Sequence, residues 1–183
     1  SALAADGAAG MAIRVTHIAA ATATLTWMTI EWMSHGKPTL VGAATGAIAG
    51  LATITPASGY VGPIGALIIG VLAGLICYKM CGIIKNKWKI DDALDVMAVH
   101  GVGGVLGILL TAPLGAVAFG GLGLSDQTIG NQFITQLIGV IAVGIWCLVI
   151  TWLITLVVRK FIGLRVTDDE EIEGLDTSIH GEK

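Results

Sequence analysis

The sequence contains few charged residues for its length. Asp, Glu, Lys and Arg make up 13% of its 183 residues, about half of the roughly 25% that is usual in a soluble domain. Hydrophobic residues make up 55%, and the mean hydropathy is +0.85. This balance argues against an ordinary soluble domain and against a basic surface for nucleic acid, and it favours an integral membrane protein.

Proline and cysteine are also scarce, with 4 and 3 residues. The low proline content and the lack of a Gly-X-Y period argue against collagen or a disordered linker, although glycine reaches 26 residues. Glycine in membrane helices instead lets backbones approach closely. Cys77, Cys81 and Cys147 are odd in number and lie in apolar segments, so we expect small buried side chains and no disulfide framework.

Motifs for catalysis and metal binding are missing as well. The sequence has no phosphate-binding loop and no nucleophile elbow, and His17, His35 and His180 lack partners at metal-ligand spacing. We therefore expect neither an enzyme nor a metal or other cofactor. The first residues, Ser-Ala-Leu-Ala-Ala, do not resemble a signal peptide.

Five apolar segments are present, and they predict an all-α integral membrane protein, a polytopic bundle of about five transmembrane helices. The segments are residues 8–33, 39–54, 61–84, 93–117 and 132–161. If they alternate across a membrane, most basic residues at their ends share one side, which the positive-inside rule places in the cytoplasm. This predicts a multi-pass protein of the cell membrane with a cytoplasmic C-terminus.

A polar, acidic stretch follows the last apolar segment. We expect two regions, with transmembrane helices in residues 1–161 and a cytoplasmic regulatory tail in residues 162–183. The regularly placed apolar residues Ile172 and Leu175 are typical of a segment that docks on its own protein. A solvated tail without a function is the alternative.

His100 is the ionisable residue that points most directly to a function. It lies in an apolar stretch without another charge between Asp95 and about Gly115, and an ionisable group at membrane depth is costly unless it has a partner or water. It could brace neighbouring helices through a hydrogen bond. Alternatively, a neutral imidazole could pass on a proton or a small polar solute, because it both donates and accepts hydrogen bonds. The glycines that follow His100 leave room for a lumen or for a close helix.

Asp92 and Asp95 precede His100 at the predicted start of the same helix. Acidic side chains at a helix N-terminus can cap free amides and interact favourably with the helix dipole. We therefore expect these two residues to have a structural, capping role.

Several ordered motifs resemble the ammonium transporter family (Amt/Mep/Rh), on its Amt side. They are Gly36–Ala43, Ala47–Leu51 with Thr55–Tyr60, Asp92–Gly104, Gly163–Val166, Glu173–Asp176 and His180–Glu182. The resemblance implies a homotrimer whose eleven-helix protomers each contain two inverted halves and a pore. By this resemblance the chain holds the seventh to eleventh helices, begins at the end of the sixth, and lacks the N-terminal half of the fold.

The resemblance also implies roles for single residues. His100 matches the second of the paired pore histidines, Ser1 the serine that recruits ammonium at the outer face, and Val96 an apolar residue of the lumen. The implied function is recruitment of ammonium, its deprotonation, and passage of ammonia past the histidine pair. The implied soluble partner is a PII-class nitrogen-signalling protein. The alternatives are an ammonium sensor that binds but conducts little, and a fragment that is inactive without the N-terminal half.

Overall fold

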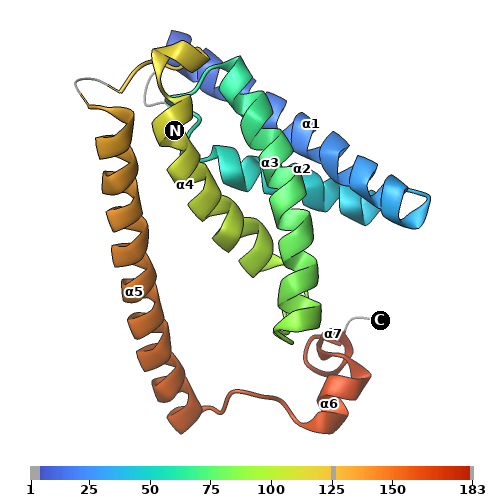
Figure 1. The fold of residues 1–183 in the computed structure, drawn as a ribbon. Helices are drawn as coiled ribbons and strands as arrows, with labels where there is room; N and C mark the ends of the chain where they lie inside the picture. Colours follow the sequence, from blue (N-terminus) through green and yellow to red (C-terminus); the bar gives the residue numbers. More distant parts are fainter. Residues whose placement is uncertain (1–4, 125–126, 182–183) are drawn as a thin grey trace. The chain divides into compact units, whose positions relative to one another are not determined.

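The computed structural model describes residues 5–124 and 127–181, and every regular element in these ranges is helical (Figure 1). The elements are α1 (Gly7–His35), α2 (Leu40–Ile54), α3 (Pro63–Gly82), η1 (Ile83–Lys87), η2 (Met97–Val102), α4 (Gly103–Leu114), η3 (Val117–Phe119), α5 (Ile129–Phe161), α6 (Asp168–Glu173) and α7 (Leu175–Ser178). This confirms the predicted all-α class. Contacts divide the chain into two units, Ser1–Val140 and Ile141–Lys183.

Each of the five predicted segments coincides with a helix. The largest difference is at the fourth, which begins at Met97 and not at Ala93. η1 and η2 are wider, π-helical turns that extend α3 and precede α4. Hydrophobic periodicity does not reveal such turns in advance, because they share the apolar composition of the helices they join.

Three helical stretches of the described chain are long and apolar enough to cross a membrane on length and composition alone. They are Pro63–Lys87, Met97–Leu114 and Ile129–Phe161. The other two predicted spans are helices that miss this standard for different reasons. α2 has only 15 residues, fewer than the roughly 17–25 of most membrane spans, whereas α1 has 29 residues but is interrupted by Arg14, His17 and several threonines.

The turn between α1 and α2 is closed by Glu31 and Thr39. The Thr39 amide donates to the Glu31 carboxylate at 2.8 Å, and the Thr39 hydroxyl accepts from the Gly42 amide at 2.8 Å. Gly42 has no side chain where the Glu31 carboxylate lies, and a Cβ there would overlap it. Gly36 ends α1 with φ 77°, a backbone conformation that glycine adopts without strain.

Glycines let α2 and α3 lie directly against the backbone of α1. A Cβ added at Gly50 of α2 would lie 2.5 Å from the Ala19 carbonyl oxygen, and one added at Gly70 of α3 would lie 2.7 Å from the same atom. Gly46 and Gly74 make similar approaches one turn further along, to Trp27 and Thr26. The small residues predicted to bring helices together therefore do so, and α1 is the element on which both neighbours converge.

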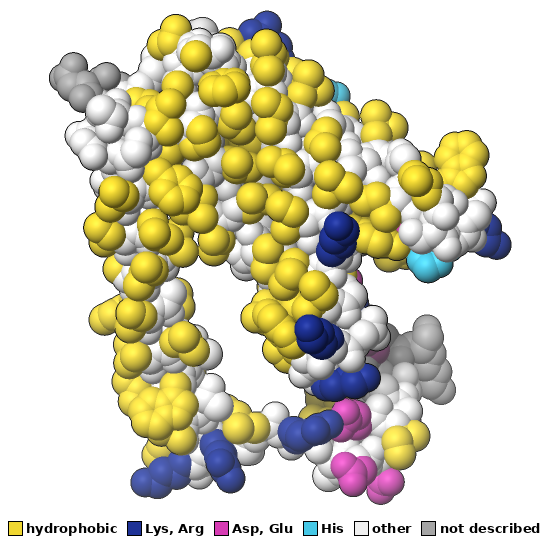
Figure 2. All heavy atoms as spheres, in the orientation of Figure 1, with side chains coloured by type: hydrophobic (Ala, Val, Ile, Leu, Met, Phe, Trp, Pro, Cys, Tyr) yellow, Lys and Arg dark blue, Asp and Glu magenta, His cyan; other side chains and the backbone are white. Residues whose placement is uncertain are grey.

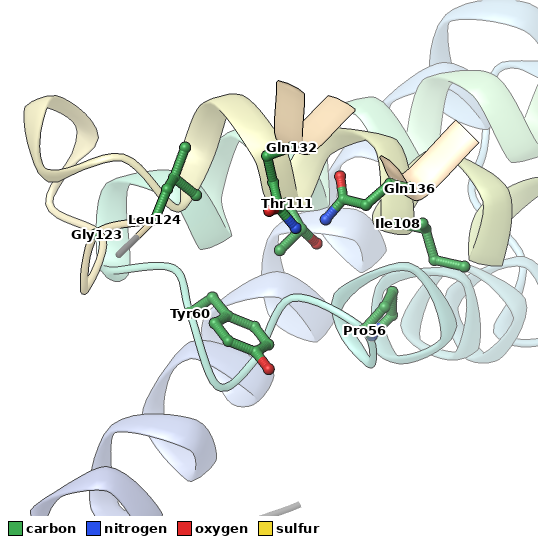
Figure 3. Close-up of a pocket in the computed structure, with 8 residues that line it drawn as sticks. All are labelled: Pro56, Tyr60, Ile108, Thr111, Gly123, Leu124, Gln132 and Gln136. Carbon is green, nitrogen blue, oxygen red and sulfur yellow. The ribbon is translucent and has the colours of Figure 1, made fainter. Parts of the chain in front are cut away.

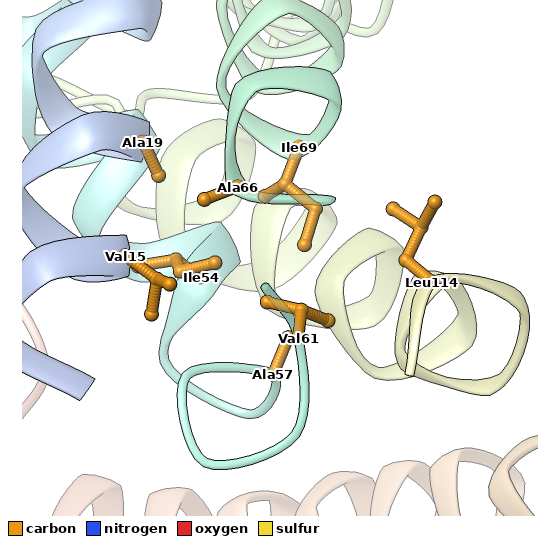
Figure 4. Packing of buried hydrophobic residues seen from close by; sticks show 8 residues of the cluster. All are labelled: Val15, Ala19, Ile54, Ala57, Val61, Ala66, Ile69 and Leu114. Carbon is orange, nitrogen blue, oxygen red and sulfur yellow. The ribbon is translucent and has the colours of Figure 1, made fainter. Parts of the chain in front are cut away.

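Apolar side chains fill the space that this convergence leaves. Figure 4 shows the main cluster, whose members come from α1, α2, α3, α4 and the turn after α2. They are Val15, Ala19, Ile54, Ala57, Val61, Ala66, Ile69 and Leu114. A second cluster contains Trp27, Ala49, Cys77 and Val99, so it links the first three helices to η2.

The outer surface is also largely apolar (Figure 2), as expected of a protein in contact with lipid or with further helices. α5 shows this most clearly, since none of its residues is buried. Cys147 lies on α5 and is exposed, so the prediction that all three cysteines are buried is wrong for this residue. Cys77 is buried and Cys81 is half-buried.

The second unit contains two short helices after α5. Thr167 and Glu170 form a reciprocal capping box at the start of α6, and these hydrogen bonds from Thr167 lower the pKa of the Glu170 carboxyl. Since the lowered pKa belongs to the folded state, the cap is complete at neutral pH and is lost as the pH falls through that pKa. Arg165 pairs with Glu171 at 2.7 Å. Phe161 ends α5, and the predicted division into membrane helices and tail at this point stays a prediction.

We expect Gly50→Ala to lower the free energy of unfolding by roughly 1–3 kcal/mol, because the new methyl group would overpack the contact with Ala19. Gly10→Ala is the matched control, since nothing lies within 4 Å of its added Cβ, and it should leave stability unchanged or raise it by up to about 1 kcal/mol. Unfolding of the purified protein in detergent measures both. Equal stability of the two variants would contradict the packing of α1 described above.

Candidate functional site

Asp92 determines where the helix that carries His100 begins. Its carboxylate accepts hydrogen bonds from the amides of Val96 at 2.8 Å and Met97 at 2.9 Å. These amides belong to the first turn, where no backbone acceptor is available. The helix begins four residues later than predicted because residues 93–95 form a turn over which this carboxylate reaches.

Asp95 completes this turn in a strained conformation. Its φ is 56°, in the left-handed region that non-glycine residues rarely adopt. Its Oδ1 atom lies 2.8 Å from Nζ of Lys85, which extends from η1. Asp92 thus bonds the amides at the start of η2, whereas the Asp95 side chain forms an ion pair with the preceding helical segment.

η2 has one buried face and one exposed face. Val99 is buried, with 2% exposure, in the cluster that contains Trp27 and Cys77. Val96 is 51% exposed, and His100, one turn later, is also exposed. Since the wider turn spans Met97–Val102, it includes His100, and wide turns of this kind occur frequently at functional sites.

A cavity of about 380 Å³ lies against His100 and Val96. Val41, Thr45 and Ile48 of α2 line its other wall, and Asp95 lines it near the start of η2. The cavity is mostly apolar, with the imidazole, the Thr45 hydroxyl and the Asp95 carboxylate as its polar groups. His100 is therefore neither closed off in a core nor distant from open space.

The glycines after His100 have two different roles. A Cβ at Gly107 would overlap the Thr53 carbonyl, and one at Gly103 would lie 2.8 Å from the Thr53 hydroxyl oxygen. These two glycines therefore let α4 pack directly against α2. Nothing lies within 4 Å of a Cβ at Gly104, one turn after His100. The alternatives of close helix and open lumen therefore apply to different glycines of the same helix.

A second cavity, of about 240 Å³, lies at the other end of α4 (Figure 3). Thr111, Gln132 and Gln136 provide polar groups, and Tyr60 lies across from them. The Gln136 Oε1 atom is buried and has no hydrogen-bond partner within the described residues. Sequence reasoning missed these glutamines, because a carboxamide near the start of an apolar helix is easily interpreted as interfacial.

The remaining candidate residues are not brought together with His100. His17 faces a separate cavity on α1, and His35 lies 3.3 Å from the Tyr78 hydroxyl. Ser1, the predicted recruitment residue, lies outside the described residues. Within residues 5–124 and 127–181, no group of His, Cys, Asp or Glu is arranged to hold a metal ion.

Comparison with known proteins places this arrangement in a family. The profile described as Ammonium Transporter Family matches residues 1–183. The chain belongs to this family. An ammonium transporter from Aquifex aeolicus is 45% identical over the whole chain and 43% of its own length, and one from Bacillus subtilis is 38% identical over the whole chain and 46% of its own length.

Solved structures of family members have the same fold. A structure titled Sensor Amt Protein is 32% identical, has a TM-score of 0.84, and matches 95% of this chain and 42% of its own. Mep2 from Candida albicans is 36% identical and has a TM-score of 0.77. This match covers 89% of the present chain and 38% of the Mep2 chain. The chain is thus a multi-pass membrane protein of the ammonium transporter family that spans less than half the length of these relatives.

Replacing Asp92 tests its part in starting η2. Asp92→Ala should lower the free energy of unfolding by roughly 0.5–2 kcal/mol, as loss of a helix cap does, because it leaves the Val96 and Met97 amides without their acceptor. Asp91→Ala, the control, removes an adjacent exposed carboxylate and should change stability by less than about 0.5 kcal/mol. Denaturant unfolding in detergent measures the free energy of unfolding of both variants. Equal values for Asp92→Ala, Asp91→Ala and the parent would contradict the capping role of Asp92.

Proposed function

We propose that this chain contributes the His100 side of a pathway that moves ammonia across the cell membrane. The proposal rests on the cavity of about 380 Å³ that exposes His100 beside Val96 and Thr45. Membership of the ammonium transporter family supports the substrate class. His100 is one of a proposed histidine pair, and its partner belongs to helices that the longer relatives contain.

The composition of the cavity favours a neutral solute at this point. An intact ammonium ion would lose its hydration among Val41, Ile48 and Val96, at a cost that these side chains do not compensate. Ammonia carries no charge and can exchange hydrogen bonds with a neutral imidazole. We therefore infer recruitment of ammonium at the outer face, deprotonation before the cavity, and passage of ammonia past His100. The released proton is transferred separately through the imidazoles of the histidine pair.

Two further roles follow from the family resemblance. Ser1 recruits ammonium at the outer face, and Val96 forms apolar wall near the imidazole, where its 51% exposure supports that role. Complete protomers contain the eleven helices of the fold and form a homotrimer, with the C-terminus in the cytoplasm. The open faces of η2 and α2 support this arrangement, because they present apolar side chains suited to contact with further helices.

The tail is proposed to bind a PII-class regulatory protein at the cytoplasmic face. Ile172 is 85% exposed and Leu175 is 46% exposed within the second unit, so both apolar side chains can enter an interface. The carboxylates of α6 surround them with charge that favours a partner carrying basic groups.

A sensor is the second candidate function, because one structural relative is titled a sensor protein. A sensor would bind ammonium without moving ammonia at a useful rate. Uptake and binding measured on the same preparation separate the two functions.

We expect His100→Ala to reduce uptake of labelled methylammonium by roughly a hundredfold, the lower end of what a positioned proton-transfer group contributes. Uptake is measured in cells or vesicles that contain this chain together with the other helices of the family fold. His17→Ala is the control, because His17 lies at a different cavity and should leave uptake unchanged. Uptake that is insensitive to His100→Ala would remove His100 from the pathway, and binding without any uptake would favour the sensor.

Removal of residues 163–183 should abolish capture of a PII-class protein by the membrane-bound transporter. The paired substitution Ile172→Ser and Leu175→Ser should weaken capture without removing any charge, since it changes only the two exposed apolar side chains. Co-sedimentation with membranes measures both. Capture that persists after the deletion would place the docking surface elsewhere.

A further inference from the structure

Lys85 and Asp95 form an ion pair that joins η1 to the end of the irregular segment before η2. Lys85 extends from η1, the continuation of α3, and Asp95 precedes η2. The Nζ and Oδ1 atoms are 2.8 Å apart, and the side chains are 38% and 20% exposed. The Oδ1 atom is itself closed off from solvent, so Lys85 compensates a partly buried charge.

The two partners line different cavities. Asp95 lines the cavity that contains His100 and Val96, whereas Lys85 does not. Lys85 instead lines a neighbouring hollow of about 420 Å³ together with Lys89, Asp91 and Asp92. Asp95 therefore belongs to the wall of the His100 cavity, and its ion-pair partner Lys85 lies outside that wall.

An unpaired carboxylate in this position would change which solutes the cavity accepts. A negative charge in a partly buried apolar wall attracts monovalent cations strongly, because little water screens it. The Lys85 ammonium cancels that attraction without entering the cavity. Asp95 also needs a firm partner because its left-handed backbone conformation persists only where surrounding contacts hold it.

We propose that Lys85 is a specificity-determining residue, which neutralises Asp95 and so keeps the His100 cavity selective for a neutral solute over monovalent cations. This proposal rests on the proposed function of the cavity. Lys85 acts only through Asp95. The pair thus has a role in solute selection beyond the structural role expected for Asp95 from the sequence.

Four variants separate charge compensation from simple stabilisation. Lys85→Met leaves Asp95 without its ion-pair partner, Lys85→Arg keeps the pair, and Lys85→Met with Asp95→Asn removes both charges. Lys87→Met is the matched control, because Lys87 lies in the same turn and the structure gives it no ion pair within the described residues. Loss of structure alone would affect the double variant at least as much as Lys85→Met.

The first measurement is potassium-dependent thermal stabilisation of the purified transporter, since it does not require transport. Lys85→Met should bind potassium about tenfold more tightly than the parent, in keeping with the attraction between two close charges near a protein surface. Lys85→Arg, Lys87→Met and the double variant should match the parent. Equal potassium dependence in Lys85→Met and Lys87→Met, or in Lys85→Met and the double variant, would overturn the proposal.

The second measurement is potassium inhibition of methylammonium uptake by the same variants. Lys85→Met should be inhibited at about one-tenth of the potassium concentration that inhibits the parent, and the double variant should recover the parent's resistance. A parent without uptake would contradict the proposed function, whereas the binding measurement would still decide the role of Lys85. A parent with uptake whose potassium sensitivity does not change in Lys85→Met would contradict only the role of Lys85.

Discussion

The close approach of two helices to the Ala19 carbonyl is the contact on which the first unit depends. Gly50 and Gly70 reach this oxygen from α2 and α3, and neither position leaves space for a methyl group. In a protein that faces lipid, apolar burial contributes little to helix association, so dense van der Waals contact must supply it. The same principle brings α4 directly against α2 through Gly103 and Gly107, while His100 of η2 remains exposed at a cavity.

Much of this architecture could be predicted from the sequence. Runs of apolar residues located all five helices, because length and hydropathy are strong signals in membrane proteins. The start of the fourth helix could not be located, because it depends on the Asp92 carboxylate bonding two amides and on the left-handed backbone of Asp95. The wide turns at Ile83–Lys87 and Met97–Val102 could not be predicted either, since their hydrogen-bond pattern has no compositional signature.

The candidate site was predictable in its chemistry but not in its surroundings. His100 stood out as a lone ionisable residue in an apolar run, yet its exposure and its cavity depend on which glycines contact α2. Spacing alone does not distinguish Gly104, beside open space, from Gly103 and Gly107, which are packed. By sequence alone, Lys85 is one of several basic residues at the ends of the apolar segments, because its partner Asp95 is ten residues away across an irregular segment.

The closed turn between α1 and α2 has a consequence for how the protein enters a bilayer. Neither helix is among those that can cross a membrane on length and composition alone. Glu31 joins their adjacent ends through Thr39, and Gly46 and Gly50 bring their backbones together, so the Glu31 carboxylate gains hydrogen-bond partners when the two helices pair. The cost of burying the Glu31 charge in a membrane is therefore a property of the hairpin and not of either helix alone.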